Sequence, residues 1–151
     1  MRKDIVELLL ARCPDSPKIR DLARDYGITS TEFHSSDDPK LKDSCILCRL
    51  CTRVCSKIGF SAISTVGRGH NKIVGPPALK PPEDCTGCGS CHRICPTGNI
   101  PMRDVNGKRF IWGREFEMLK CEKCGKAYIT KDYAQALMKR KGLPEEYFNV
   151  C

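Results

Sequence analysis

Two short runs of cysteines carry the chemistry of this 151-residue sequence. Each run has the spacing C-x₂-C-x₂-C-x₃-C, and a proline follows the second. The cysteines are Cys45, Cys48, Cys51 and Cys55, followed by Cys85, Cys88, Cys91 and Cys95. A loop with this spacing can place three thiolates on three corners of an iron–sulfur cubane, and two such runs are typical of proteins with two [4Fe–4S] clusters. The likeness of the two runs indicates an internal duplication of one metal-binding unit.

The spacing also predicts which cysteine serves which cluster. In the two-cluster pattern, the last cysteine of each run ligates the cluster of the other run. We therefore expect one cluster on Cys45, Cys48, Cys51 and Cys95, and a second on Cys85, Cys88, Cys91 and Cys55. Such crossed ligation would make the clusters close neighbours, so that single electrons could pass between them. Ser56 stands where proline is usual, which predicts an altered loop and unchanged ligation.

A third group of cysteines lies further along the sequence. Cys121 and Cys124 form a C-x-x-C pair before Gly125, and Cys151 comes later. C-x-x-C-G is typical of a zinc-ribbon knuckle, in which four ligands close a tetrahedral structural site. We expect zinc at these three cysteines, with a third [4Fe–4S] cluster or no metal as alternatives, and the spacing does not identify a fourth ligand. Cys13 stands alone, as expected of a packed thiol.

The charge balance fits a protein that carries clusters. The formal net charge is +8, the mean hydropathy is −0.38 and aromatic residues make up 7% of the chain. An oxidised [4Fe–4S] cluster with four thiolates carries about −2, so two clusters would bring the protein to about +4. We interpret the basic excess as compensation for cluster charge, with a basic docking face for an acidic partner as the alternative. Metal sites would then supply stability that a small apolar core cannot.

The beginning of the chain shows no signal peptide. Residues 5–10 form a short apolar run that Glu7 interrupts, and this run is too short and too charged to span a membrane. Thiolates persist in a reducing compartment. We therefore expect a cytoplasmic protein without direct membrane insertion.

The pattern around the motifs predicts an α+β fold in three parts. Residues 1–42 are expected to form a helical N-terminal segment. Residues 43–107 are expected to form a two-[4Fe–4S] ferredoxin-like domain, with the cysteine runs in loops that enter short helices and with short strands at 60–66 and 72–74. Residues 108–151 are expected to form a C-terminal zinc-ribbon-like unit.

Local signals place the remaining elements. Ser16, followed by proline, is a plausible N-cap for a helix that Gly27 would end. Residues 35–39 are a polar linker, and residues 110–112 suggest a strand. Thr130 is expected to cap a last helix, which glycine and proline would end.

The cysteine motifs carry a family resemblance. The segment CILCRLCTRVC at 45–55 resembles the ferredoxin-like segment of the large iron–sulfur subunit of NADH–quinone oxidoreductase, which the electron-transfer subunits of NAD-reducing and iron-only hydrogenases share. The resemblance continues through VGRG at 66–69 and CTGCGSC at 85–91 to CPTG at 95–98. It covers roughly residues 8–100 and does not include the later C-x-x-C-G piece.

The resemblance also extends upstream. LLLARCP at 8–14 and DLARDYG at 21–27 resemble a stretch that binds an additional cluster through histidine and cysteines in that family. Of those ligands only Cys13 remains, so the resemblance implies that this chain has lost the additional cluster.

The function that the resemblance implies is electron transfer within a cytosolic, anaerobic multi-subunit oxidoreductase. The chain would not be an enzyme on its own; its partner would be a catalytic subunit with a tungsten or molybdenum cofactor, a flavin or a hydrogenase metal site. Further electron-transfer subunits or ferredoxin would also be partners. Small proteins of this type resemble the subunit that accompanies the tungsten-containing subunit of class II benzoyl-CoA reductase.

Two other functions compete with this one. A freely diffusing ferredoxin would need neither the N-terminal helices nor the third cysteine group. A basic nucleic-acid-binding protein with structural clusters is the second alternative, but the sequence has no basic helix or aromatic platform to support it. The sequence also lacks a dinucleotide-binding glycine motif, a Walker loop and a hydrolytic triad pattern.

Overall fold

The computed structural model describes residues 1–33 and 44–151 of the chain. The polar linker expected at 35–39 lies outside these described residues. Within the described ranges, no helix combines the length and the hydropathy that crossing a bilayer requires.

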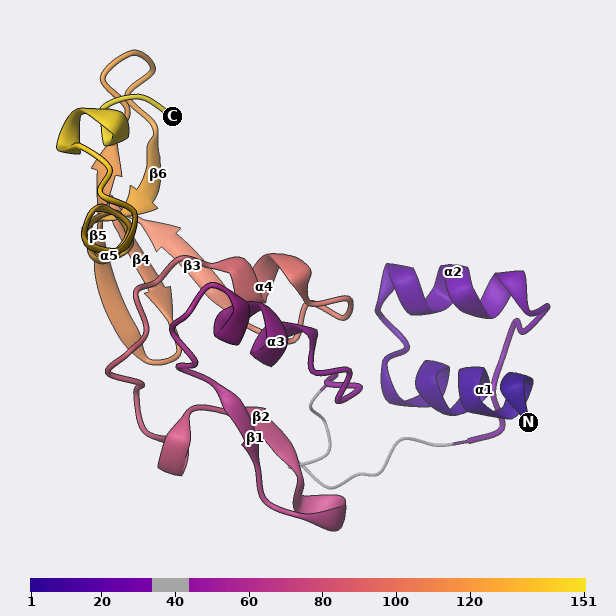
Figure 1. Ribbon diagram of the computed structural model, residues 1–151. Coiled ribbons are helices and arrows are strands. Elements are labelled where there is room, and N and C mark those ends of the chain that lie inside the picture. The colour runs from indigo at the N-terminus through magenta and orange to yellow at the C-terminus, as the bar shows by residue number, and fades with distance from the viewer. Residues whose placement is uncertain (34–43) are drawn as a thin grey trace.

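The chain begins with a pair of helices, α1 (Arg2–Arg12) and α2 (Pro17–Asp25), which lie apart from the sheet (Figure 1). As predicted, Ser16 is the N-cap residue of α2 and proline occupies its first turn. Gly27 follows the helix with φ of +70°, a left-handed conformation that ends helices and favours glycine.

The helix pair has a small hydrophobic core of its own and is tied to the rest of the chain. Val6, Ala23 and Ile28 are buried together. The thiol of Cys13 donates to the carbonyl of Ser44 at 2.9 Å. The hydroxyl of Ser16, instead of capping its own helix, donates to the carbonyl of Pro96 at 3.2 Å.

Short elements surround the two cysteine runs. In chain order they are α3 (Leu50–Lys57), β1 (Ser64–Val66), η1 (Gly69–Asn71), β2 (Ile73–Gly75), η2 (Pro77–Leu79) and α4 (Ser90–Ile94). β1 and β2 pair antiparallel, and α3 packs against α4. The first predicted strand starts too early, because the N–H groups of Phe60 and Ser61 donate to the carbonyl of Cys55 and thereby close the end of α3.

A meander of antiparallel strands follows. Its strands, in spatial and chain order, are β3 (Met102–Val105), β4 (Lys108–Ile111), β5 (Arg114–Lys120) and β6 (Ala127–Thr130). Asn106 and Gly107 connect β3 to β4, and Trp112 and Gly113 connect β4 to β5. All four residues have positive φ, as two-residue type I′ turns require.

These hairpins refine the sequence-based expectations. The strand expected at 110–112 starts earlier and ends before Trp112, because Trp112 belongs to a turn. The expected boundary after residue 107 falls in the turn between β3 and β4, so one sheet joins residues from both sides of it. The division into three parts remains a prediction.

The C-terminal part packs back on the sheet. Helix α5 (Lys131–Lys141) contacts β5 and β6, and η3 (Glu145–Phe148) follows it. As predicted, Thr130 is the N-cap residue of α5, and Gly142 ends the helix in a left-handed conformation. The guanidinium of Arg140 donates to the carbonyls of Ile58 and Gly59 at 2.9 and 2.7 Å, which joins α5 to the end of α3.

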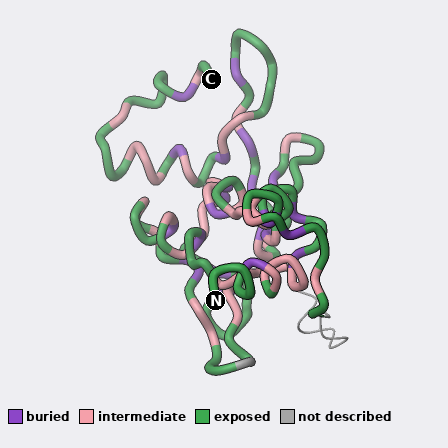
Figure 2. Tube along the Cα trace, turned by 90° about the vertical axis from the view of Figure 1, so that its right-hand side faces the viewer, coloured by how far each residue is buried: buried purple, intermediate pink, exposed green. Residues whose placement is uncertain are grey.

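The main hydrophobic core lies where α3, α4 and the sheet meet. Its buried residues are Cys51, Cys55, Ala62, Ile63, Cys91, Ile100, Ile111 and Phe116. Figure 2 shows buried and half-buried segments gathered in the middle of the molecule, with largely exposed loops extending from it. Three of these eight core residues are cysteines, so a metal or cluster bound to their sulfurs would also stabilise the core.

Candidate metal centres

The two cysteine runs have the same backbone shape. Each is a loop that leads directly into a short helix, the first into α3 and the second into α4. Leu47 and Gly87, at equivalent positions, have φ of 54° and 67°, and Arg49 and Gly89 have 62° and 75°. The duplication seen in the sequence is therefore also a duplication of backbone conformation.

The two loops reach this conformation at different cost. Leu47 and Arg49 carry side chains in the left-handed region, which costs about 1 kcal/mol or more for each such residue. Glycine avoids this cost in the second loop, where it also makes room. A Cβ at Gly87 would lie 2.6 Å from the ring of Phe116 and 3.1 Å from the methyl group of Thr130.

The structure brings four of the predicted ligands together around one small cavity. Its cysteines are Cys45, Cys48, Cys51 and Cys95, and its other lining residues include Val74, Ile100 and Trp112. Cys95 belongs to the second run and the other three to the first. Cys48 is exposed, whereas Cys51 is buried.

The other four predicted ligands lie near one another, since Cys55, Cys85, Cys88 and Cys91 influence one another electrostatically. Burial raises the pKa of Cys91 to about 11, the indole N–H of Trp112 acts in the opposite direction, and Cys88, Cys85 and Cys55 raise it further through their charges. These electrostatic effects require proximity, so Cys55 of the first run joins three cysteines of the second.

Burial favours the protonated form of four of these eight thiols. It raises the pKa of Cys51, Cys55 and Cys85 as well as that of Cys91. A metal or cluster that binds must therefore displace protons. Each set offers four sulfur atoms and a largely apolar surrounding, which is the donor chemistry that a [4Fe–4S] cluster needs.

The pKa of Cys95 shifts in the opposite direction to those of these four thiols. Burial raises its pKa, but the hydroxyl of Thr97 and the backbone N–H groups of Thr97, Asn99 and Gly98 outweigh burial and lower it. The loop after Pro96 therefore stabilises negative charge on this sulfur even before a metal binds.

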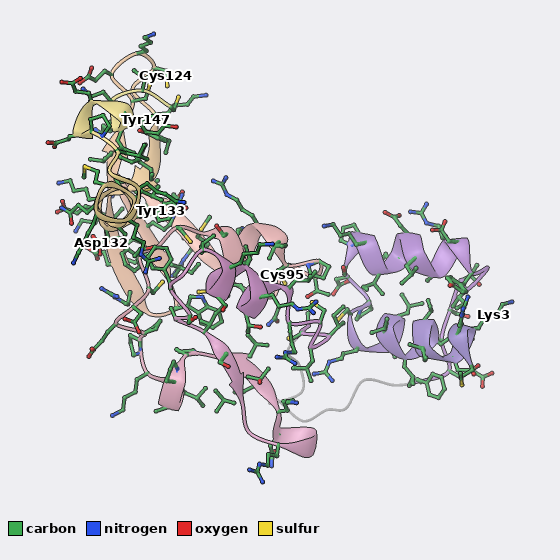
Figure 3. All side chains as sticks on the ribbon, viewed as in Figure 1. Lys3, Cys95, Cys124, Asp132, Tyr133 and Tyr147 are labelled. Atoms are coloured by element: carbon green, nitrogen blue, oxygen red, sulfur yellow. The ribbon has the colours of Figure 1, made fainter. Side chains whose placement is uncertain are left out.

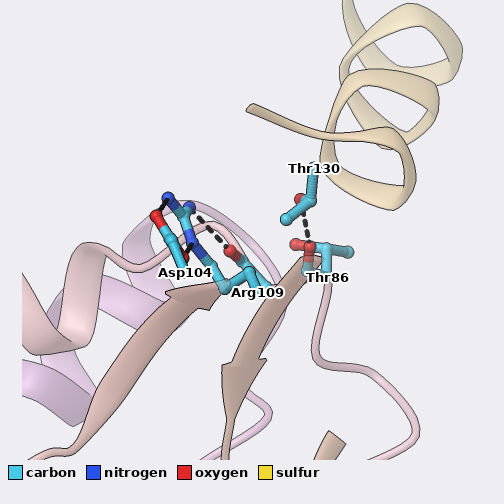
Figure 4. A network of polar contacts seen from close by, with 5 residues as sticks. Thr86, Asp104, Arg109 and Thr130 are labelled. Atoms are coloured by element: carbon cyan, nitrogen blue, oxygen red, sulfur yellow. Dashed lines mark hydrogen bonds and ion pairs between the residues drawn. The ribbon is translucent and has the colours of Figure 1, made fainter. Parts of the chain in front are cut away.

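Two arginines of the sheet hold the second loop in place, and sequence reasoning missed both. The guanidinium of Arg109 forms a fork with the carboxylate of Asp104, at 2.8 and 2.7 Å, and donates to the carbonyl of Gly87 at 3.1 Å (Figure 4). Its side chain is only 3% exposed. Arg114 donates to the carbonyl of Cys85 at 2.8 Å.

A further contact of this kind comes from the start of helix α5. The hydroxyl of Thr130 donates to the carbonyl of Thr86 at 2.6 Å, so the N-cap side chain binds the cysteine loop (Figure 4). One sequence signal could have identified the Arg109 pair. The two-residue Asn106–Gly107 turn fixes the register in which Asp104 lies opposite Arg109.

The third group of cysteines also comes together, far from the others. The sulfur atoms of Cys121, Cys124 and Cys151 lie within 4.8 Å of one another. The connection between β5 and β6 supplies the first two, and the chain after η3 supplies the third. Figure 3 places Cys124 at the far end of the sheet from Cys95.

Backbone donors prepare this third group for a cation. The N–H of Cys151 donates to the sulfur of Cys121 at 3.4 Å. This hydrogen bond, followed by those from the N–H groups of Cys124 and Lys123, lowers the pKa of Cys121 to about 6. A thiolate is therefore available near neutral pH.

Comparison with known proteins bears on the segment that holds the two cysteine runs. Two family models, both described as a 4Fe–4S dicluster domain, match residues 41–102 and 84–129. Residues 41–129 of this chain are therefore similar to 4Fe–4S dicluster domains. The matched residues contain both cysteine runs and extend into the sheet.

Two curated relatives of this chain are subunits of oxidoreductases. The NADP-reducing hydrogenase subunit HndD of Solidesulfovibrio fructosivorans is 28% identical over 137 residues, covering 74% of this chain and 22% of the relative. An NADH-quinone oxidoreductase subunit of Rhizobium meliloti (strain 1021) is 26% identical over 151 residues, covering 82% of this chain and 17% of the relative. The chain thus spans about a fifth of the length of these relatives.

Proposed function

We propose that this dicluster chain is a non-catalytic electron-transfer subunit of a multi-subunit oxidoreductase. When bound, the two [4Fe–4S] clusters supply one-electron acceptors and donors. The observation that carries the proposal is the gathering of the eight run cysteines into two adjacent sets of four. The names of the two relatives, one from a hydrogenase and one from an NADH-quinone oxidoreductase, support a role beside a catalytic subunit.

The proposed ligation is crossed between the runs. Cys95 completes the set of Cys45, Cys48 and Cys51, and Cys55 completes the set of Cys85, Cys88 and Cys91. The shared cavity of the first set supports this assignment. The exposed Cys48 would give the first cluster an outlet toward a partner.

The proposed partner is a catalytic subunit with a tungsten or molybdenum cofactor, a flavin or a hydrogenase metal site, in the cytoplasm of an anaerobic cell. An apolar stripe on α1 supports docking of such a subunit. Met1, Ile5 and Leu8 follow one another at helical spacing, and they are 94%, 52% and 50% exposed. Burying this stripe against a partner would remove apolar surface from water.

We also propose a structural zinc ion at Cys121, Cys124 and Cys151. Three sulfur atoms within 4.8 Å and a depressed thiol pKa support this ion, and a third [4Fe–4S] cluster is the alternative. The zinc would tie the end of the chain to the β5–β6 connection. Its fourth ligand would come from outside these three residues.

Metal analysis of anaerobically prepared full-length protein tests the proposal. We expect about eight iron and about eight sulfide per chain from two Cys₄ cubanes, and about one zinc. Cys124→Ala should remove the zinc and leave the iron unchanged. About four iron in fully loaded protein would contradict the two clusters, and about twelve iron without zinc would contradict the zinc site.

A further inference from the structure

Trp112 occupies a backbone position that suits its residue type poorly. It is the first residue of the two-residue turn between β4 and β5, with φ of 54°, and Gly113 follows with 74°. Such turns favour asparagine, aspartate or glycine at this position, and the neighbouring turn does have Asn106 there. A bulky residue that stays in the left-handed region is often held there for a function.

The indole of Trp112 reaches both sets of cysteines. Its Nε1–H donates to the sulfur of Cys91 at 3.4 Å. The same residue lines the cavity around the first set, beside Cys51 and Cys95. It also packs against the buried core that contains Cys55. Trp112 therefore contacts one set of cysteines and lines the cavity of the other.

The two sets of cysteines receive hydrogen bonds from different kinds of side chain, a hydroxyl in the first set and an indole N–H in the second. Side-chain donors to sulfurs of these sets include the indole N–H of Trp112 at Cys91 and the hydroxyl of Thr97, 3.6 Å from Cys95. Hydrogen bonds to cluster sulfurs are among the features that set reduction potentials, because the reduced cluster carries one more negative charge. An N–H donor therefore favours the reduced state of the cluster that it touches.

We propose that Trp112 is a positioning residue that raises the reduction potential of the cluster held by Cys91. The indole N–H stabilises the extra charge on that cluster, so an electron resides there more readily than it would without the donor. This proposal rests on the two-cluster function above. It holds whether ligation is crossed or local, because Cys91 belongs to the second cluster in either case.

The decisive experiment is an anaerobic potentiometric titration of full-length, cluster-loaded protein, followed by EPR. Trp112→Phe keeps an aromatic ring and removes the N–H. At a fixed solution potential, the ratio of reduced to oxidised cluster should fall about threefold to tenfold for the cluster held by Cys91. A tenfold change in this ratio corresponds to about 59 mV for a one-electron couple. The other cluster should change little. Phe60→Leu, in the same core, is the matched control and should move neither potential.

A second measurement keeps the native shape of the residue. Trp112 is the one tryptophan of the sequence, so growth on 5-fluorotryptophan alters this residue alone. Fluorination makes the N–H a stronger donor, so the same ratio should rise. Unchanged potentials in both the phenylalanine and the fluorinated protein, or equal shifts of both clusters, would overturn the inference. Failure to load two clusters in the unaltered protein would instead overturn the proposed function.

Discussion

At the scale of single residues, Cys55 gives the sharpest test of ligation. It belongs to the first run by sequence, but it raises the pKa of Cys91 in the second set. We expect Cys55→Ala to damage the cluster of Cys85, Cys88 and Cys91, because a cubane that lacks one thiolate readily loses an iron. EPR of the variant should then show a three-iron signal from that cluster.

The matched variant for this test is Cys51→Ala. It removes a buried cysteine from the same run and should damage the other cluster. If both variants affect the same cluster, ligation is local to each run and the crossed assignment is wrong.

Gly87 tests how closely the second loop fits against the sheet. Alanine at this position would adopt φ of +67° and place its Cβ 2.6 Å from the ring of Phe116. Overpacking costs about 1–3 kcal/mol, and the left-handed conformation adds about 1 kcal/mol. We expect a clear fall in the thermal midpoint, followed by circular dichroism and by the visible absorbance of the clusters.

Gly107→Ala separates the two contributions. Gly107 has φ of +74°, and a Cβ at this position would meet no other atom within 4 Å. The control therefore carries the backbone strain without the clash, and its midpoint should fall less. Equal falls for the two variants would show that the Phe116 contact is unimportant.

At the scale of elements, the helix pair has two possible roles that the structure allows us to separate. Its hydrogen bonds to the carbonyls of Ser44 and Pro96 are adjacent to the proposed ligands Cys45 and Cys95. Deleting the helices would therefore disturb both the cluster loops and any docking surface. Substitutions on the outer face of α1 would disturb the docking surface and leave the cluster loops intact.

We therefore expect Ile5→Glu combined with Leu8→Glu to abolish co-purification of the partner subunit and leave the iron content unchanged. Both side chains are about half exposed, so the helix pair should still fold. Lys3→Glu, also on α1 and exposed, is the matched charge control and should retain the partner. If the double variant still co-purifies with the partner, α1 is not part of the docking surface.

Sequence patterns predicted the elements with strong local signals. The cap and terminator around α2, the helix after Thr130 and the loop-to-helix form of both cysteine runs are all confirmed. The strand expected from residue 60 begins later, because hydrophobic spacing cannot reveal that the chain first closes α3. The contacts of Arg109 and Arg114 escaped prediction because they join segments that only the sheet brings together.

At the scale of the whole molecule, the last prediction is that the purified chain alone turns over no substrate. The proposed clusters exchange single electrons, and this prediction follows from the proposed role as an electron-transfer subunit. Under that proposed role, catalysis needs a second subunit with its own cofactor.

The measurement is anaerobic dye reduction by the loaded chain with NADH, formate or hydrogen as the electron donor. We expect no rate above that of the dye and donor alone, although chemically reduced chain should pass electrons to the dye. Adding the catalytic subunit should restore turnover, and the Ile5→Glu, Leu8→Glu variant should restore it poorly because docking fails. Turnover by the single chain would contradict the subunit role, since it would require a substrate site within this polypeptide.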